Sequence, residues 1–297
     1  MTIESTKRPH ENLRHFLAGG ISGACAETIV APIERAKLLL QLQSVNSQLL
    51  KQSHYKGFFD VIKRIPKEQG FTSLWRGNGV NVVRYFFTQA LNFSFKEKYQ
   101  KLFHSEGETF YKFFFSNLAA GGLAGATSLC FVFPLDLART KLALDIGKKE
   151  SREYKGLADV IGAIYRKNGF RGLYNGFQIS VVGIFFYRSV YFGGFDTAKT
   201  YLPPNPSLFL QWGAAQSVAM CSGLVAYPFD SVRRRMMMQS GKDKKLYTSG
   251  LQCFKTVIKE EGFRALYKGS IINMFRGTGG AIVLVCYEYL DRYLTFV

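Results

Sequence analysis

The chain has 297 residues, 47% of them hydrophobic, and its 39 Lys and Arg against 21 Asp and Glu give a net charge of +18. An aromatic content of 15% excludes a disordered chain, and the composition matches neither collagen nor a disulfide scaffold. A positive charge of this size indicates a polyanionic partner, which is a nucleic acid, an anionic lipid surface or a highly charged small molecule.

The first 15 residues are polar and of mixed charge. They lack both the apolar centre of a secretory signal and the acid-poor pattern of a transit peptide, so we expect no cleaved presequence. The five cysteines show no CxxC spacing, and four of them lie in apolar segments. We therefore expect them to pack as small core residues, and we expect neither a metal site nor a cofactor.

Six apolar segments follow one another along the chain, most of them near the ~20 residues that a membrane-spanning helix needs. They are residues 16–40, 79–95, 113–137, 177–195, 208–229 and 271–287. Long basic connections separate them at about residues 41–78, 142–175 and 240–269. Glu27, Arg84, Arg188 and Arg276 lie within these segments. Charges at such depth are costly and usually face a water-filled interior or a partner.

A threefold internal repeat organises these segments. The motif PIERAK at residues 32–37 recurs as PLDLAR at 134–139 and as PFDSVR at 228–233. Pairs of small residues precede each proline at fixed offsets, a spacing that allows close helix packing in lipid: Gly19 and Gly23, Gly121 and Gly125, Ala215 and Ala219. Downstream of each motif, a glycine is followed by an aromatic residue and then by a second glycine. In the three repeats this second glycine is Gly77, Gly176 and Gly269, respectively.

Each motif predicts a helix that bends at its proline and carries an acid and a base on one face. Three such helices around an axis form a ring in which each acid pairs with the base of the next repeat. The predicted pairs are Glu34 with Arg139, Asp136 with Arg233, and Asp230 with Lys37. We interpret the ring as a gate. The alternative is a set of solvated charges at helix ends, worth ~0–1 kcal/mol each.

The triplicated motif resembles that of the mitochondrial carrier family, and the resemblance covers nearly the whole chain. It implies an all-α membrane protein with six transmembrane helices in three pseudo-threefold repeats, at residues 1–110, 111–205 and 206–297. Short amphipathic helices are implied on the matrix side, one of them at residues 58–68. A monomer in the mitochondrial inner membrane is also implied, with alternating access and both termini toward the intermembrane space. Cardiolipin is expected at the helix starts after Gly77, Gly176 and Gly269.

Two stretches resemble the ADP/ATP carriers within that family, which implies ADP and ATP as substrates. They are RYFFTQALNF at residues 84–93 and RRRMMM, the signature made of Arg233, Arg234, Arg235, Met236, Met237 and Met238. We expect packing from most of the methionines. Arg233 is expected in the matrix gate, while Arg234 and Arg235 are candidates for attracting or binding phosphate.

An adenine nucleotide requires clustered cations beside an apolar slot. The positions seven residues after the three glycines supply Arg84, Gly183 and Arg276, two cations for phosphates and a glycine that leaves room for a ring. Ile184 and Tyr187 lie next to Gly183 on one helical face, and the family places its contact points here; ordinary packing is the alternative for both. Lys96 matches a base that the family uses during nucleotide entry, with a solvated surface lysine as the alternative.

The gate on the opposite, cytoplasmic side follows the family pattern less closely. Asp196 and Lys199 fit an acid–base pattern in the second repeat. Glu97 has a glutamine where its base belongs, and Glu288 has an acid there. We therefore expect this gate to close with fewer ion pairs.

Three residues depart from the ADP/ATP carrier pattern. Glu27 replaces a lysine, Ala226 replaces a hydroxyl-bearing residue, and Phe87 replaces a proline of the second helix. Glu27 changes the cavity charge by two units, so we expect it to neutralise Arg84 or Arg276 and weaken nucleotide binding.

ADP/ATP exchange is the leading hypothesis. One alternative is a carrier-fold structural subunit, docked to a larger inner-membrane assembly, with weak or lost transport. Another is a carrier of a different nucleotide. A nucleic-acid-binding protein is not expected because no groove-reading module accompanies the apolar segments. An enzyme is not expected either, because the four histidines lie outside these segments and form no nucleophile–base pattern.

Overall fold

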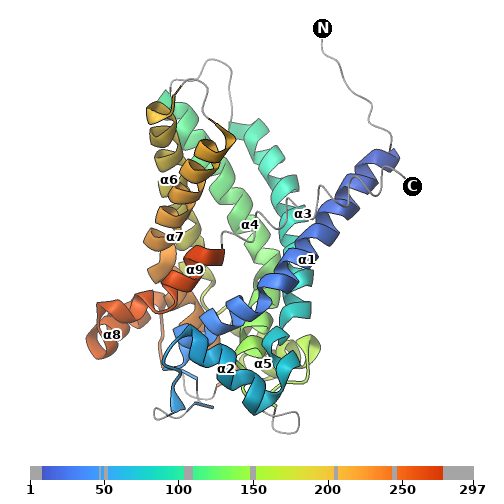
Figure 1. Ribbon diagram of the computed structural model, residues 1–297, viewed down its shortest axis with the longest axis vertical. Coiled ribbons are helices and arrows are strands. Elements are labelled where there is room, and N and C mark those ends of the chain that lie inside the picture. The colour runs from blue at the N-terminus through green and yellow to red at the C-terminus, as the bar shows by residue number, and fades with distance from the viewer. Residues whose placement is uncertain are drawn as a thin grey trace.

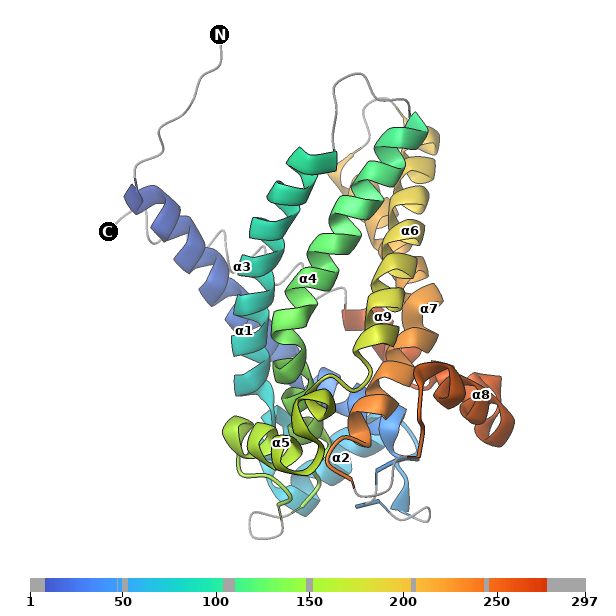
Figure 2. The ribbon, with the colours of Figure 1, turned by 180° about the vertical axis from the view of Figure 1, so that it is seen from behind.

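The computed structural model describes residues 9–46, 48–49, 53–103, 110–147, 152–203, 207–242 and 246–276. Its long helices form the wall of the molecule (Figure 1). They are α1 (Pro9–Leu42), α3 (Asn78–Phe103), α4 (Phe110–Leu144), α6 (Phe177–Tyr201) and α7 (Leu208–Met238). α3 packs along α4, and α6 packs along both α4 and α7, as the view from behind also shows (Figure 2).

The first five predicted spans are thus confirmed as helices. The sixth, residues 271–287, begins in α9 (Ser270–Arg276), and the rest of it lies outside the described residues. The prolines of the repeated motif, Pro32, Pro134 and Pro228, lie inside α1, α4 and α7, and each helix continues beyond its proline.

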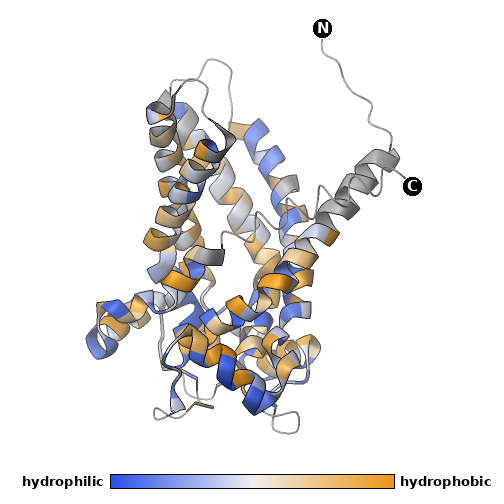
Figure 3. Cartoon of the chain, viewed as in Figure 1, coloured by the Kyte–Doolittle hydropathy of each residue, from blue (hydrophilic) through white to orange (hydrophobic). Residues whose placement is uncertain are grey.

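Short helices occupy the long basic connections, as predicted. They are α2 (Phe58–Gln69), α5 (Leu157–Leu173) and α8 (Gly250–Glu261), and the 3₁₀ turns η2 (Phe71–Trp75) and η3 (Phe263–Tyr267) follow α2 and α8. They gather at the lower end of the molecule in Figures 1 and 2, which we call the short-helix end. Hydrophilic and hydrophobic residues lie side by side on α2 and α8, which makes these helices amphipathic (Figure 3).

Three hydrophobic clusters form the core at the short-helix end, one beneath each repeat. Val61 and Ile65 of α2 belong to the first, Val160 and Ile164 of α5 to the second, and Val257 of α8 to the third. Each short helix therefore buries its apolar face against the end of a long helix, which fixes the end of the wall where the motif residues lie.

Glycines at the starts of α3, α6 and α9 bring these helices close to α4, α7 and α1 of the neighbouring repeats, respectively. Their φ angles are positive, at 84° for Gly77, 94° for Gly176 and 85° for Gly269. A Cβ on each would meet the carbonyl oxygen of a motif base: Arg139 at 3.2 Å, Arg233 at 2.9 Å and Lys37 at 3.4 Å, respectively. Glycine is thus required at these positions by both conformation and space.

The small residues of the repeat also allow close helix contacts. A Cβ on Gly23 of α1 would lie 2.2 Å from the Tyr85 ring of α3. On α4, a Cβ on Gly121 would lie 2.7 Å from the Arg188 guanidinium, and one on Gly125 would lie 3.2 Å from Ile184, both of α6. These distances agree with the close approach that the small-residue spacing predicts.

By length and composition, one described segment, Phe115–Leu144 in α4, is apolar enough to cross a membrane. Other long helices carry charged residues along their lengths, such as Glu27 in α1, Arg84 in α3 and Arg188 in α6. These charges lower the mean hydropathy of their helices, although several of them face the interior rather than the outer surface.

Candidate functional site

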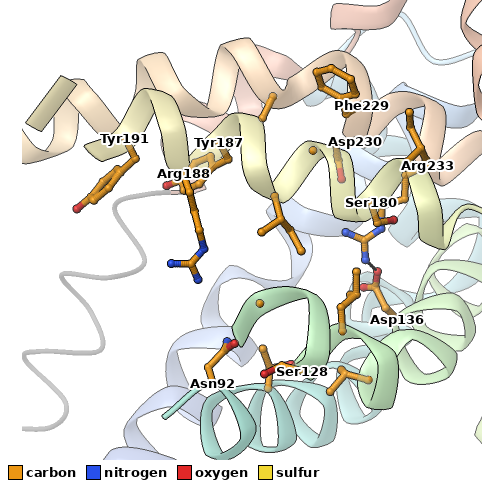
Figure 4. Close-up of a pocket in the computed structure, with 18 of the residues that line it drawn as sticks. Asn92, Ser128, Asp136, Ser180, Tyr187, Arg188, Tyr191, Phe229, Asp230 and Arg233 are labelled. Atoms are coloured by element: carbon orange, nitrogen blue, oxygen red, sulfur yellow. Dashed lines mark hydrogen bonds and ion pairs between the residues drawn. The ribbon is translucent and has the colours of Figure 1, made fainter. Parts of the chain in front are cut away.

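A cavity of about 720 Å³ lies between α3, α4, α6 and α7. Its lining includes Arg84, Asn92 and Lys96 from α3, Ser128 and Asp136 from α4, Gly183, Ile184, Tyr187 and Arg188 from α6, and Ala226 and Arg233 from α7. Figure 4 shows Tyr187, Arg188 and Tyr191 toward one end, and Asp136, Ser180, Asp230 and Arg233 at the other. The cavity is therefore aromatic at one end and strongly charged at the other.

The charged end is built on a ring of six motif residues, which we call the charge ring. Its ion pairs are Glu34 with Arg139, Asp136 with Arg233, and Asp230 with Lys37. These are the three pairs that the repeat predicts. None of the six side chains is more than 24% exposed, so the alternative of freely solvated charges is wrong. Three of its members, Asp136, Asp230 and Arg233, line the cavity.

Further polar contacts support the ring. The Lys37 ammonium is 3.4 Å from the Asp230 carboxylate and donates to Asn273 of α9 over 2.7 Å. Arg234 donates to both carboxylate oxygens of Asp230 at 3.0 and 3.1 Å and lies 3.4 Å from the Thr140 hydroxyl. Arg234 is thus part of the ring's support and does not line the cavity.

Arg84 lies just above the ring and contacts two acceptors. Its Nη2 and Nε donate to the side-chain oxygen Oδ1 of Asn81 at 3.0 and 3.3 Å, and its Nε is 3.8 Å from a carboxylate oxygen of Asp136. Asn81 in turn donates to Glu27. Glu27 does not line the cavity itself, and it contacts the site through the side chain of Asn81.

Arg188 lies in the cavity wall above Arg84, against Gly121 and Gly125 of α4. Within the described part of the chain, neither Arg188 nor Lys96 makes an ion pair with a side chain, and both line the cavity. We did not predict Arg188 as a site residue from the sequence. Its charge within an apolar segment was the signal that identifies it.

The apolar wall of the cavity comes from α6 and α7. Gly183 faces Phe229, and a Cβ at residue 183 would lie 3.0 Å from the Phe229 Cβ, so part of the space left by the glycine is closed by α7. Ile184 and Tyr187 line the cavity beside it. Tyr187 and Tyr191 stack with ring centroids 6.0 Å apart. Such apolar and aromatic surfaces can pack against a flat aromatic group.

The arginines and methionines at residues 233–238 lie at the end of α7. Arg235 is buried and donates to Glu261 of α8, with one of the two contacts at 2.9 Å. Burial alone raises the pKa of Glu261, but the hydrogen bond and charge of Arg235, with Lys268, outweigh burial and lower it. Met236, Met237 and Met238 are buried and pack into the third, second and first hydrophobic clusters, respectively. The expectation that the methionines pack is confirmed.

At the opposite end of the wall, Glu97 pairs with Lys101 one turn along α3, at 2.9 Å. This contact joins residues of one helix and links no two repeats. The side chains of Asp196, Lys199 and Arg276, and the whole of Glu288, lie outside the described residues.

Ala226 and Phe87, the other two residues that depart from the ADP/ATP carrier pattern, lie on different sides of the wall. Ala226 lines the cavity, where a hydroxyl would have offered a polar contact. Phe87 is 55% exposed on the outer surface of α3, and α3 is a continuous helix there. Ala226 therefore bears on the cavity directly, whereas Phe87 does not.

A buried polar network that we did not predict joins the first two repeats. Arg35 is 2% exposed, and it donates to the carbonyl oxygens of Ala143 and Asp145 at 3.0 and 3.1 Å and to that of Ser73. The Asp145 carboxylate pairs with Arg76. Arg35 thus satisfies carbonyls at the end of α4 that the helix leaves unpaired.

A sequence model described as mitochondrial carrier protein matches residues 8–107, 111–206 and 204–297 of the chain. The chain is 52% identical to ADP/ATP translocase 2 of Tachyglossus aculeatus aculeatus and to that of Rattus norvegicus. Both alignments cover 94% of this chain and 97% of the relative. It is also 52% identical to human ADP/ATP translocase 4, over 94% of this chain and 91% of that protein.

Proposed function

Because the chain belongs to the mitochondrial carrier family, we propose that it exchanges ADP for ATP across the mitochondrial inner membrane by alternating access. It is a carrier and not an enzyme. The observation that carries the proposal is the cationic cavity above a closed charge ring. A nucleotide with three or four negative charges requires several cations at once, and an apolar surface for its base.

In the proposed cycle, Lys96 and Arg188 attract the phosphates into the cavity, and Arg84 and Arg233 bind them near its charged end. Gly183, Ile184 and Tyr187 receive the adenine. Arg276 lies as many residues after Gly269 as Arg84 lies after Gly77, so we include Arg276 among the phosphate ligands. Binding of phosphate to Arg233 competes with its ion pair to Asp136 and thereby weakens the charge ring.

The charge ring is then the matrix gate, and the short helices lie on the matrix side. In this state the gate is closed and the cavity faces the other compartment. Glu97, Asp196, Lys199 and Glu288 belong to the opposing gate, which forms when the ring opens. Exchange of ATP for ADP moves one net negative charge, worth ~2.3 kcal/mol per 100 mV of membrane potential.

We further propose that the carrier acts as a monomer with both termini toward the intermembrane space. Cardiolipin binds at the starts of α3, α6 and α9 in this proposal, because free backbone N–H groups at helix N-termini attract phosphate. A structural subunit without transport is not favoured, because the cavity keeps its cations and its ring. A different nucleotide is not favoured either, in view of the relatives.

The test is thermal unfolding of the purified protein with ADP, ATP, AMP, GTP or phosphate. A ligand at 100 times its dissociation constant stabilises the folded state by ~2.7 kcal/mol. We expect a rise in the unfolding midpoint with ADP and ATP only, and exchange of ADP for ATP in liposomes. A folded protein that no nucleotide stabilises would refute the proposal. Stabilisation by GTP alone would show that the substrate is a guanine nucleotide and not ADP or ATP.

A further inference from the structure

Glu27 of α1 meets the cavity through one buried amide. The Asn81 side chain is 1% exposed, and its Nδ2 donates to Glu27 Oε2 and, over 3.4 Å, to Glu34 Oε2 of the charge ring. The Oδ1 of the same amide accepts both hydrogen bonds from Arg84. One carboxamide therefore joins an acid of α1, an acid of the ring and the arginine above the ring.

The two carboxylates determine which way this amide points. A carboxylate accepts hydrogen bonds and cannot donate one, so the amino group of Asn81 must face Glu27 and Glu34. The oxygen then faces Arg84. Without an acceptor at residue 27, only the longer contact with Glu34 holds the amino group, and the amide is free to rotate away from Arg84.

We propose that Glu27 is a positioning residue that holds the Arg84 guanidinium at the charged end of the cavity through Asn81. The inference deepens the proposed nucleotide exchange and rests on it. It also replaces the expectation that Glu27 weakens binding by neutralising Arg84. In that charge-only view, removal of the carboxylate strengthens nucleotide binding; if Glu27 is a positioning residue, its removal weakens binding.

Two substitutions at residue 27 separate these views. Glu27→Gln removes the charge but keeps an oxygen that accepts from Asn81, whereas Glu27→Ala removes both. We expect KM for ADP within twofold of the wild-type value for Glu27→Gln. For Glu27→Ala we expect a rise on the order of fivefold, the effect of about one lost hydrogen bond, with little change in maximal exchange rate. Glu260→Gln, an exposed acid on α8, is the matched control and is expected to leave KM unchanged.

A double-mutant cycle tests the route through Asn81. If Glu27 acts through this amide, Glu27→Ala has no further effect on KM in an Asn81→Ala background. The readouts are ADP exchange in liposomes and the nucleotide-induced shift in unfolding midpoint. If Asn81→Ala does not fold, the comparison of Glu27→Gln with Glu27→Ala decides by itself.

Equal decreases in KM for Glu27→Gln and Glu27→Ala would overturn the proposal in favour of the charge-only view. Additive effects in the double-mutant cycle would also overturn it, because Glu27 would then act by another route. In both cases a wild-type protein that exchanges ADP leaves the proposed function standing. A wild-type protein that is folded but neither binds nor exchanges nucleotide would refute the two together.

Discussion

A single methyl group added at Gly176 would disturb the packing of the charge ring. Its φ is 94°, and a Cβ would lie 2.9 Å from the Arg233 carbonyl oxygen and 3.1 Å from Met236. Neither the backbone oxygen of Arg233 nor the buried Cβ of Met236 can move away at low energetic cost. Gly176→Ala therefore combines a backbone penalty of about 1–3 kcal/mol with an overpacking penalty of about 1–3 kcal/mol.

Two other glycines separate these contributions. Gly262 has a φ of 81° with nothing within 4 Å of a Cβ, so Gly262→Ala has only the backbone penalty. Gly162 lies inside α5 with open space around it, and Gly162→Ala should stabilise by ~0.5–1 kcal/mol through helix propensity. We expect the unfolding midpoint, measured in one detergent, to be highest for Gly162→Ala and then to fall in the order wild type, Gly262→Ala and Gly176→Ala. The midpoint should change by roughly 2 °C per kcal/mol.

A Gly176→Ala midpoint equal to that of Gly262→Ala would refute the contact with Arg233, because the backbone penalty would then account for the whole effect. A Gly262→Ala midpoint at or above the wild-type value would refute the backbone argument itself. The first result would show that Gly176 does not set the distance between α6 and the charge ring.

Three further predictions concern buried polar groups. Arg139→Ala removes the cation that pairs with the buried Glu34 carboxylate, so we expect a loss of about 3–5 kcal/mol in unfolding free energy, partly restored by Glu34→Ala in the same chain; the measurement is denaturant unfolding. Burial raises the pKa of the Cys253 thiol to about 12, so a maleimide at pH 8 should leave Cys253 unmodified until the protein unfolds, as mass spectrometry can check. The pKa of Glu261 is lower in the folded protein than in the unfolded chain, so its ionised carboxylate stabilises the folded protein above the ordinary carboxylate pKa. This stabilisation is lost as the pH falls through the folded-state pKa. The unfolding midpoint of Glu261→Gln should therefore depend less on pH between 3 and 6 than that of the wild type.

The repeat was sufficient to predict the charge ring because symmetry supplies the partners. Once three copies of an acid–base pair lie around an axis, each acid has one nearby base of the next copy, and Asp136 with Arg233 follows without a structure. The long helices were predicted from the apolar segments, and the amphipathic short ones from the resemblance to the carrier family. These features depend only on what the three repeats share.

Residues in which the repeats differ were not predictable in this way. Met236, Met237 and Met238 are adjacent in sequence, and a helix turns about 100° per residue, so packing on different faces was expected. That each enters the cluster of a different repeat depends on where α7 ends relative to α2 and α5. Arg188 and the Asn81 amide were missed because they contact residues of another helix that the repeat does not pair with them: Gly121 and Gly125 of α4 for Arg188, and Glu27 and Glu34 of α1 for Asn81.

The pseudo-threefold ring is supported unequally, and this asymmetry indicates where it opens. Four residues after the glycines that start α3, α6 and α9 lie Asn81, Ser180 and Asn273. Asn81 donates to Glu34 and Asn273 accepts from Lys37, so at this position two of the three pairs receive an amide hydrogen bond from a neighbouring helix. The Ser180 hydroxyl bonds the carbonyl of its own helix at Gly176.

The pair beside Ser180 is Asp136 with Arg233, and both of its residues line the cavity, whereas Glu34, Arg139 and Lys37 do not. This pair also contacts Arg84, whose Nε is 3.8 Å from Asp136 Oδ1, but it is the pair that a ligand in the cavity reaches first, and we expect the ring to open there. Ser180→Asn adds an amide that can brace this pair; it should slow exchange several-fold and raise the unfolding midpoint without nucleotide. Ser189→Asn, at a second α6 serine bonded to its own helix, is the control. An unchanged exchange rate in Ser180→Asn with a raised midpoint would contradict opening at this pair, because the added brace would then not affect the slow step.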